Sequence, residues 1–123
     1  MDSSLEYQID ITHQCALVTY HARPEFSEWK ATMDLLFADP RFRSNFAIVL
    51  DATRVPNPPA IECVGEAVRY IDSKIERFPM LRWAMVAANA SSFRVGQMAE
   101  KMVRINSLRT FGSVKEAMAW VVE

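Results

Sequence analysis

The stretch Phe46-Ala-Ile-Val-Leu50 consists of five consecutive apolar residues and is followed by Asp51. An uninterrupted apolar run of this length is typical of a central β-strand that is covered on both faces. A second run of this kind spans Trp83 to Ala88. Between the two runs, apolar residues recur at steps of three and four, which predicts an amphipathic helix from Ile61 to Phe78 that Pro79 ends. Buried strands that alternate with helices predict parallel pairing and an α/β fold.

The residues before this region predict a hairpin and a helix. Tyr7 to Ile11 alternates apolar and polar residues, as a half-buried strand does, and Cys15 to Tyr20 is a second strand after a short break. Such a brief connection implies antiparallel pairing. Pro24 fits the first turn of a helix, and Asp39 before Pro40 ends it. We expect this helix to bury one stripe, formed by Phe26, Trp29, Met33, Leu36 and Phe37.

The residues after the second apolar run predict two more helices with a strand between them. Ser91 or Ser92 is a suitable N-cap for the first of these helices, and Ser113 for the second. The strand spans Leu108 to Phe111. The predicted order is ββαβαβαβα in a single domain of residues 1–123, with a mixed five-stranded sheet in which only the first strand is antiparallel. The residues expected to face inward are Val95, Met98, Met102 and Ile105 in one helix and Val114, Ala117, Met118 and Val121 in the other.

Charge and composition exclude several classes of protein. Fourteen basic and fifteen acidic residues give a net charge of -1, which argues against a nucleic-acid binder, since such a protein usually has a basic excess. No apolar run approaches the roughly 18 residues that a membrane span needs. The first residues have no basic segment followed by an apolar one, so we expect no signal peptide and a cytoplasmic protein.

The cysteines and histidines do not form a metal-binding or redox motif. Cys15 and Cys63 lie 48 positions apart in apolar surroundings, and we expect two reduced, mostly buried thiols. His13 and His21 are eight residues apart along a strand, about 26 Å at ~3.3 Å per residue, too far to share one metal ion. There is no glycine-rich phosphate loop. We therefore expect neither a metal nor a cofactor.

Three strings resemble the SpoIIAA-like branch of the STAS superfamily (sulfate-transporter and anti-sigma-factor-antagonist domains), in particular its small bacterial members. They are Leu35-Leu-Phe-Ala-Asp-Pro-Arg-Phe-Arg43, Ile48-Val-Leu-Asp51 and Phe111-Gly-Ser-Val-Lys-Glu-Ala-Met-Ala-Trp120. Together with the order of elements, the resemblance covers nearly the whole chain. It implies a SpoIIAA-like fold and a regulatory, interaction or ligand-binding module that is not an enzyme.

One segment departs from that family. Anti-sigma-factor antagonists carry a phosphorylatable serine at the start of the helix that follows the central strand. Here the corresponding stretch is Asp51-Ala-Thr-Arg-Val-Pro-Asn-Pro-Pro-Ala60, which has three prolines and no serine. Thr53 has the segment's single hydroxyl, and it lies too close to the strand to match. We therefore expect no phosphorylation switch of that type.

Polar residues follow each of the predicted parallel strands. Open α/β sheets bind small molecules in the crevice beyond the carboxyl ends of their strands, so we expect a ligand site at this edge. Backbone N–H groups at the start of the helix near Ser92 suit an anionic group, with Arg23 or Arg54 beside it. The proline segment would form a rigid rim, with Arg54 and Asn57 beside Asn89 and Ser91. The predicted ligand-binding residues are His21, Arg23, Asp51, Thr53, Arg54, Asn89, Ser91 and Ser92.

Other interpretations of these residues stay open. The polar side chains could serve only to cap helices and solvate loops. His21, Asp51 and Ser91 have the composition of a hydrolase triad, although no Gly-x-Ser-x-Gly turn is present and a serine that opens a helix is usually a cap. A small hydrolase is therefore the alternative to a non-enzymatic binding module, and a purely structural dimer subunit is a third hypothesis.

The partners expected from the sequence are a small ligand, a regulatory protein or a second copy of the chain. Both apolar strands need cover on two faces, and if the helices pack mainly on one face, a homodimer would supply it. Met85, Met98 and Met102 could line an adaptable apolar pocket or partner groove, or they could simply be core residues.

Overall fold

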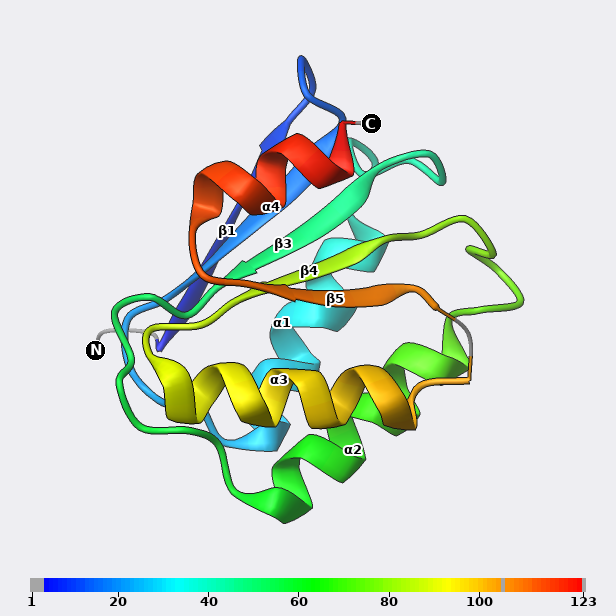
Figure 1. Cartoon of the computed structure of the whole chain (residues 1–123). Coiled ribbons are helices and arrows are strands. Elements are labelled where there is room, and N and C mark those ends of the chain that lie inside the picture. The colour runs from blue at the N-terminus through cyan, green and yellow to red at the C-terminus, as the bar shows by residue number, and fades with distance from the viewer. Residues whose placement is uncertain (1–3, 105, 123) are drawn as a thin grey trace.

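The computed structural model describes residues 4–104 and 106–122, and within these ranges it forms one five-stranded mixed sheet (Figure 1). The strand order is β1-β2-β3-β4-β5. β1 pairs antiparallel with β2, and the three remaining pairs are parallel. The α/β class, the order of elements and the single antiparallel strand predicted from the sequence are thus confirmed. The strands are β1 (Leu5–Asp10), β2 (Cys15–Tyr20), β3 (Ala47–Asp51), β4 (Trp83–Val86) and β5 (Leu108–Phe111).

The helices of the described chain divide unequally between the two faces of the sheet (Figure 1). Three of them, α1 (Phe26–Ala38), α2 (Ile61–Ser73) and α3 (Ala90–Met102), cover one face. The short α4 (Val114–Val121) lies across β3, β4 and β5 on the other. The large core therefore lies on the side of α1, α2 and α3.

Aromatic rings dominate the large core. Trp29 of α1 stacks on Trp83 of β4, with 6.3 Å between ring centroids, and meets the Tyr70 ring edge-on at 5.4 Å. The Trp29 indole N–H donates a buried hydrogen bond of 2.9 Å to the Tyr20 hydroxyl at the end of β2. The stripe predicted for α1 is buried at Trp29, Met33, Leu36 and Phe37, while Phe26 is half-buried. These contacts attach α1 to the sheet.

The second, smaller core lies under α4. Val49, Ala84 and Val86 have no exposed surface and pack with Ala117 of α4. Ser113 caps this helix as predicted, because its hydroxyl oxygen accepts a hydrogen bond from the Glu116 N–H. Both faces of β3 and β4 are thus covered within one chain. Among the described residues, β3 and β4 leave no uncovered apolar face to explain the homodimer expected from the sequence, and the homodimer stays a prediction.

The helix predicted from Ile61 to Phe78 is shorter than expected. α2 ends at Ser73, where the Ser73 hydroxyl donates to the Tyr70 carbonyl and so competes with the helical hydrogen bonds. The next amide, that of Lys74, bonds the Ile71 carbonyl three residues back, and the chain continues in turns. Phe78 is nevertheless buried, whereas Ile61 at the helix start is 63% exposed. The regular spacing of apolar residues thus continues beyond Ser73, where the helix itself ends.

The start of α3 also differs from the prediction. Its N-cap is Asn89, whose side-chain oxygen accepts a hydrogen bond from the Ser92 N–H, and not Ser91 or Ser92. Met98 is half-buried and Met102 is 46% exposed, while Ile105 lies outside the described residues. The buried face of α3 instead contains Ser92 and Gly96.

Gly96 allows α3 to approach β5 closely. A Cβ atom on this residue would lie 2.6 Å from the Thr110 side chain. Because real Cβ atoms are not found so close to other heavy atoms, a larger residue would force the helix and strand apart. The position of α3, and with it one wall of the site described next, depends on this glycine.

Candidate ligand-binding cavity

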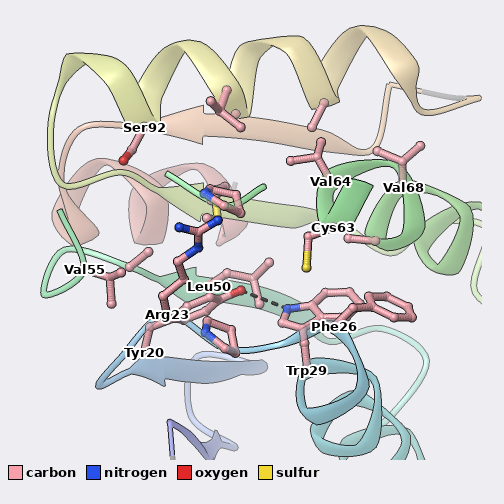
Figure 2. A pocket seen from close by; sticks show the side chains of 18 of the residues that line it. Tyr20, Arg23, Phe26, Trp29, Leu50, Val55, Cys63, Val64, Val68 and Ser92 are labelled. Atoms are coloured by element: carbon pink, nitrogen blue, oxygen red, sulfur yellow. Dashed lines mark hydrogen bonds between the residues drawn. The ribbon is translucent and has the colours of Figure 1, made fainter. Parts of the chain in front are cut away.

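A cavity of about 130 Å³ lies between the sheet and the three helices that cover its larger face (Figure 2). Its walls are almost entirely apolar. β3, β4 and β5 contribute Leu50, Met85 and Leu108, and the helices contribute Trp29, Val64 and Ala99 among others. An engineered apolar cavity of comparable size in another protein binds benzene. This space therefore suits a ring-sized apolar group.

Small side chains on the helices make room for the cavity. Ala67 of α2 and both Gly96 and Ala99 of α3 line it, where longer side chains would fill it. Gly96 at the same time brings the α3 backbone against β5. The cavity is thus formed by small residues on helices that are themselves held firmly on the sheet.

Tyr20 places a buried hydroxyl among these apolar walls, since the residue is 7% exposed and lines the cavity. The hydroxyl oxygen accepts a hydrogen bond from the Trp29 indole N–H. Within residues 4–104 and 106–122, the hydroxyl itself donates no hydrogen bond. Burial raises the pKa of Tyr20 well above its usual range, while the bond from Trp29 opposes the shift. Tyr20 is therefore a neutral hydrogen-bond donor at any physiological pH.

Part of the cavity wall is formed by the proline segment. Val55, Asn57 and Pro59 line the cavity, and the segment is tied to the start of α3. The Asn89 side-chain N–H donates to the Pro56 carbonyl at 2.7 Å, and the Ser92 hydroxyl lies 3.5 Å from the same oxygen. Asn89 thus both caps α3 and positions the proline segment.

Arg23 and Ser92 are the two predicted ligand-binding residues that line the cavity. Arg23 follows β2, and Figure 2 shows its side chain extending toward α3. Ser92 is in the first turn of α3 and is buried. Both residues follow the carboxyl end of a strand, β2 and β4 respectively, so the cavity reaches the strand carboxyl edge of the sheet.

The remaining predicted residues lie near this edge but bond to other groups. His21 contacts Arg54, with 3.3 Å between its Nδ1 and an Arg54 guanidinium nitrogen. Asp51 accepts hydrogen bonds from both the amide and the hydroxyl of Thr53. Asn89 holds the proline segment, as described, and Ser91 is exposed on α3. None of these residues lines the cavity.

The trio expected for a hydrolase is not assembled in the described chain. The second ring nitrogen of His21, Nε2, lies 3.0 Å from a carboxylate oxygen of Glu6, and Nδ1 contacts Arg54. Asp51 is occupied by Thr53. No hydrogen bond joins His21 to Asp51 or to Ser91 among the described residues, although a triad needs such bonds.

Sequence reasoning missed most of the cavity because its walls resemble ordinary core. Of the methionines considered as pocket residues, Met85 lines the cavity, and neither Met98 nor Met102 does. Tyr20 was assigned to a strand and Trp29 to a core stripe, and both descriptions are correct but incomplete. The available signal was the placement of Ala67, Gly96 and Ala99 on helix faces that turn toward the sheet.

Cys63 of α2 has its thiol in the cavity wall, and Figure 2 shows the sulfur pointing toward Phe26 and Trp29. Burial raises the pKa of Cys63, and the nearby Glu66 carboxylate adds to the effect. Burial also raises the pKa of Cys15, to about 11. Both cysteines are free thiols, as expected from the sequence.

Searches for related proteins and for two general features add little to this geometry. Among the described residues, no group of three or more histidine, cysteine, aspartate or glutamate side chains could hold a metal ion. No helix in the same part of the chain is long and apolar enough to cross a membrane. Comparisons with protein-family models, with curated proteins and with solved structures found no match to the chain.

Proposed function

We propose that this protein is a non-enzymatic, STAS-like regulatory or interaction module that binds a small, mainly apolar ligand in the cavity at the carboxyl edge of its sheet. The observation that supports this proposal is the cavity of about 130 Å³, with apolar walls and a mouth beside Arg23 and Ser92. Ligand sites in proteins are typically concave and apolar, with a few placed polar groups.

The energetic cost of the cavity supports the same proposal. At ~24 cal/mol per Å³, a sealed void of about 130 Å³ would lower stability by about 3 kcal/mol, and the opening to solvent makes the cost of this cavity smaller. Domains are typically stable by only about 5–15 kcal/mol, so even part of that cost matters. An apolar ligand that fills the space would recover much of it, because apolar surface on both sides leaves water.

The STAS-like part of the proposal rests on the three resembling strings and on the order of elements. Within that proposal the phosphorylation switch of anti-sigma-factor antagonists is left out. The Thr53 hydroxyl donates a 2.7 Å hydrogen bond to the Asp51 carboxylate, and a phosphate on Thr53 would meet this negative charge. Ligand binding would then be the signal that the module responds to.

Calorimetric titration with toluene tests the binding proposal. We expect one saturable site with a dissociation constant on the order of 1 mM or below, given the small size of the probe. Ala99→Leu should abolish binding because the new side chain occupies the cavity. The matched control is Ala119→Leu, the same change at an exposed position of α4 on the other face. Absence of saturable binding to the wild-type protein, or equal binding by the Ala99→Leu variant, would reject the proposal.

A further inference from the structure

Four polar side chains, those of Tyr20, Arg23, Asn57 and Ser92, interrupt the otherwise apolar lining, and two of them present hydrogen-bond donors that bear on the choice of ligand. One is the Tyr20 hydroxyl, which has accepted the Trp29 N–H and still has a hydrogen to donate. The other is the Arg23 guanidinium, three residues further along the chain. In Figure 2 the hydroxyl points into the pocket, and the Arg23 side chain extends from beside Tyr20 toward α3. Both groups are donors.

Arg23 has no charged partner within residues 4–104 and 106–122, where the ion pairs involve other cations. Arg54, the other arginine near this edge, contacts His21 and does not line the cavity. An arginine that faces an apolar space without an acid partner can accept a carboxylate in a two-bond fork.

The acidic residues nearby do not take the place of that partner. Glu25 and Glu66 lie close enough to influence the Cys63 thiol, but neither lines the cavity. Arg23 is the charged side chain that does. The charge presented to a ligand at the mouth is therefore positive.

We propose that the ligand is a small monocarboxylic acid with a ring-sized or branched apolar group, whose carboxylate binds Arg23 and the Tyr20 hydroxyl. This inference rests on the proposed function and names the chemical class of its ligand. The apolar group lies among Leu50, Val64 and Ala99, and the carboxylate lies between the buried Tyr20 hydroxyl and the exposed Arg23 side chain. Placing the charge there avoids the cost of burying it without a partner.

Tyr20 contributes selectivity as well as a hydrogen bond. Its hydroxyl is fixed by the bond from Trp29, so its remaining hydrogen is directed without further loss of freedom. A ligand without an acceptor at this point leaves that hydrogen unbonded in an apolar surrounding, which is unfavourable. Hydrocarbons therefore bind less tightly than carboxylates of the same size.

Calorimetric titrations with phenylacetate and with its uncharged analogue phenylacetamide test the inference at neutral pH. We expect phenylacetate to bind wild-type protein about tenfold more tightly, because a charge-assisted bond to Arg23 is stronger than a neutral one. Arg23→Gln should remove this preference, and Arg23→Lys should retain part of it. Arg69→Gln is the matched control, since Arg69 is exposed on α2 and does not line the cavity.

The outcomes separate this inference from the proposed function. If toluene binds but phenylacetate and phenylacetamide bind wild-type protein equally, the cavity is a binding site and the carboxylate inference is wrong. The same conclusion follows if Arg23→Gln keeps the full preference for phenylacetate. If neither toluene nor phenylacetate binds, both proposals fail.

Discussion

Replacing Ala99 by leucine should stabilise the protein, although most core substitutions do the opposite. Ala99 lies on α3 and lines the cavity, so the three added carbon atoms enter existing space. At ~0.8 kcal/mol per buried carbon their transfer from water contributes about 2.4 kcal/mol. Fixing the leucine rotamer costs roughly 0.5–1 kcal/mol. The open mouth and imperfect fit reduce the gain further, and we expect a net increase of about 1 kcal/mol in the free energy of unfolding.

Urea unfolding and calorimetric melting measure this change. For a domain of this size, about 1 kcal/mol raises the melting temperature by roughly 3–5 °C. The control Ala119→Leu, on the exposed side of α4, should change stability by less than ~0.5 kcal/mol. A loss of more than 1 kcal/mol in Ala99→Leu would show that the space is already filled, and would refute the cavity.

Four further expectations follow from the fold and the loops. Ile71→Ala should cost about 2–5 kcal/mol in urea unfolding, because Ile71 is buried in the large core, and a cost below half a kilocalorie would show that α2 is misplaced. Gly96→Ala should cost about 1–3 kcal/mol, since its Cβ would lie 2.6 Å from Thr110, and an unchanged melting temperature would contradict that close contact. Mass spectrometry of protein from cells should find no stoichiometric phosphate on Thr53. Finding such a phosphate would contradict the expectation that the protein has no phosphorylation switch. Light scattering at tens of micromolar should give twice 14.0 kDa if the homodimer forms, and 14.0 kDa would exclude it.

The sheet could be predicted from the sequence because its signals are local. Phe46 to Leu50 and Trp83 to Ala88 are apolar without interruption, and the structure places β3 and β4 within one or two residues of these bounds. The end of α2 could not be placed, because apolar spacing continues to Phe78 while the Ser73 hydroxyl ends the helix by bonding a backbone carbonyl. A competing hydrogen bond of this kind leaves no trace in the hydrophobic pattern.

The predicted site and the cavity share the strand carboxyl edge, but most of the predicted polar side chains do not line the cavity. Arg23 and Ser92, which the rule that ligands bind beyond strand carboxyl ends indicated, do line it. Asp51 and Asn89 are equally polar, yet they are engaged by Thr53 and by Pro56. The cavity itself arises from packing across three helices and four strands. A small residue such as Ala99 indicates such a space only when the positions of the opposite walls are known.

Ligand binding in the cavity is tested most directly by following backbone amide resonances of labelled protein during a toluene titration. We predict saturable shifts for Leu50, Val64 and Ala99, and for Ser92 at the mouth, with little change in α4. Shifts confined to the amides of α4, or to amides of exposed residues such as Met80, would place the ligand elsewhere on the surface. A spectrum that does not change at saturating toluene would contradict ligand binding altogether.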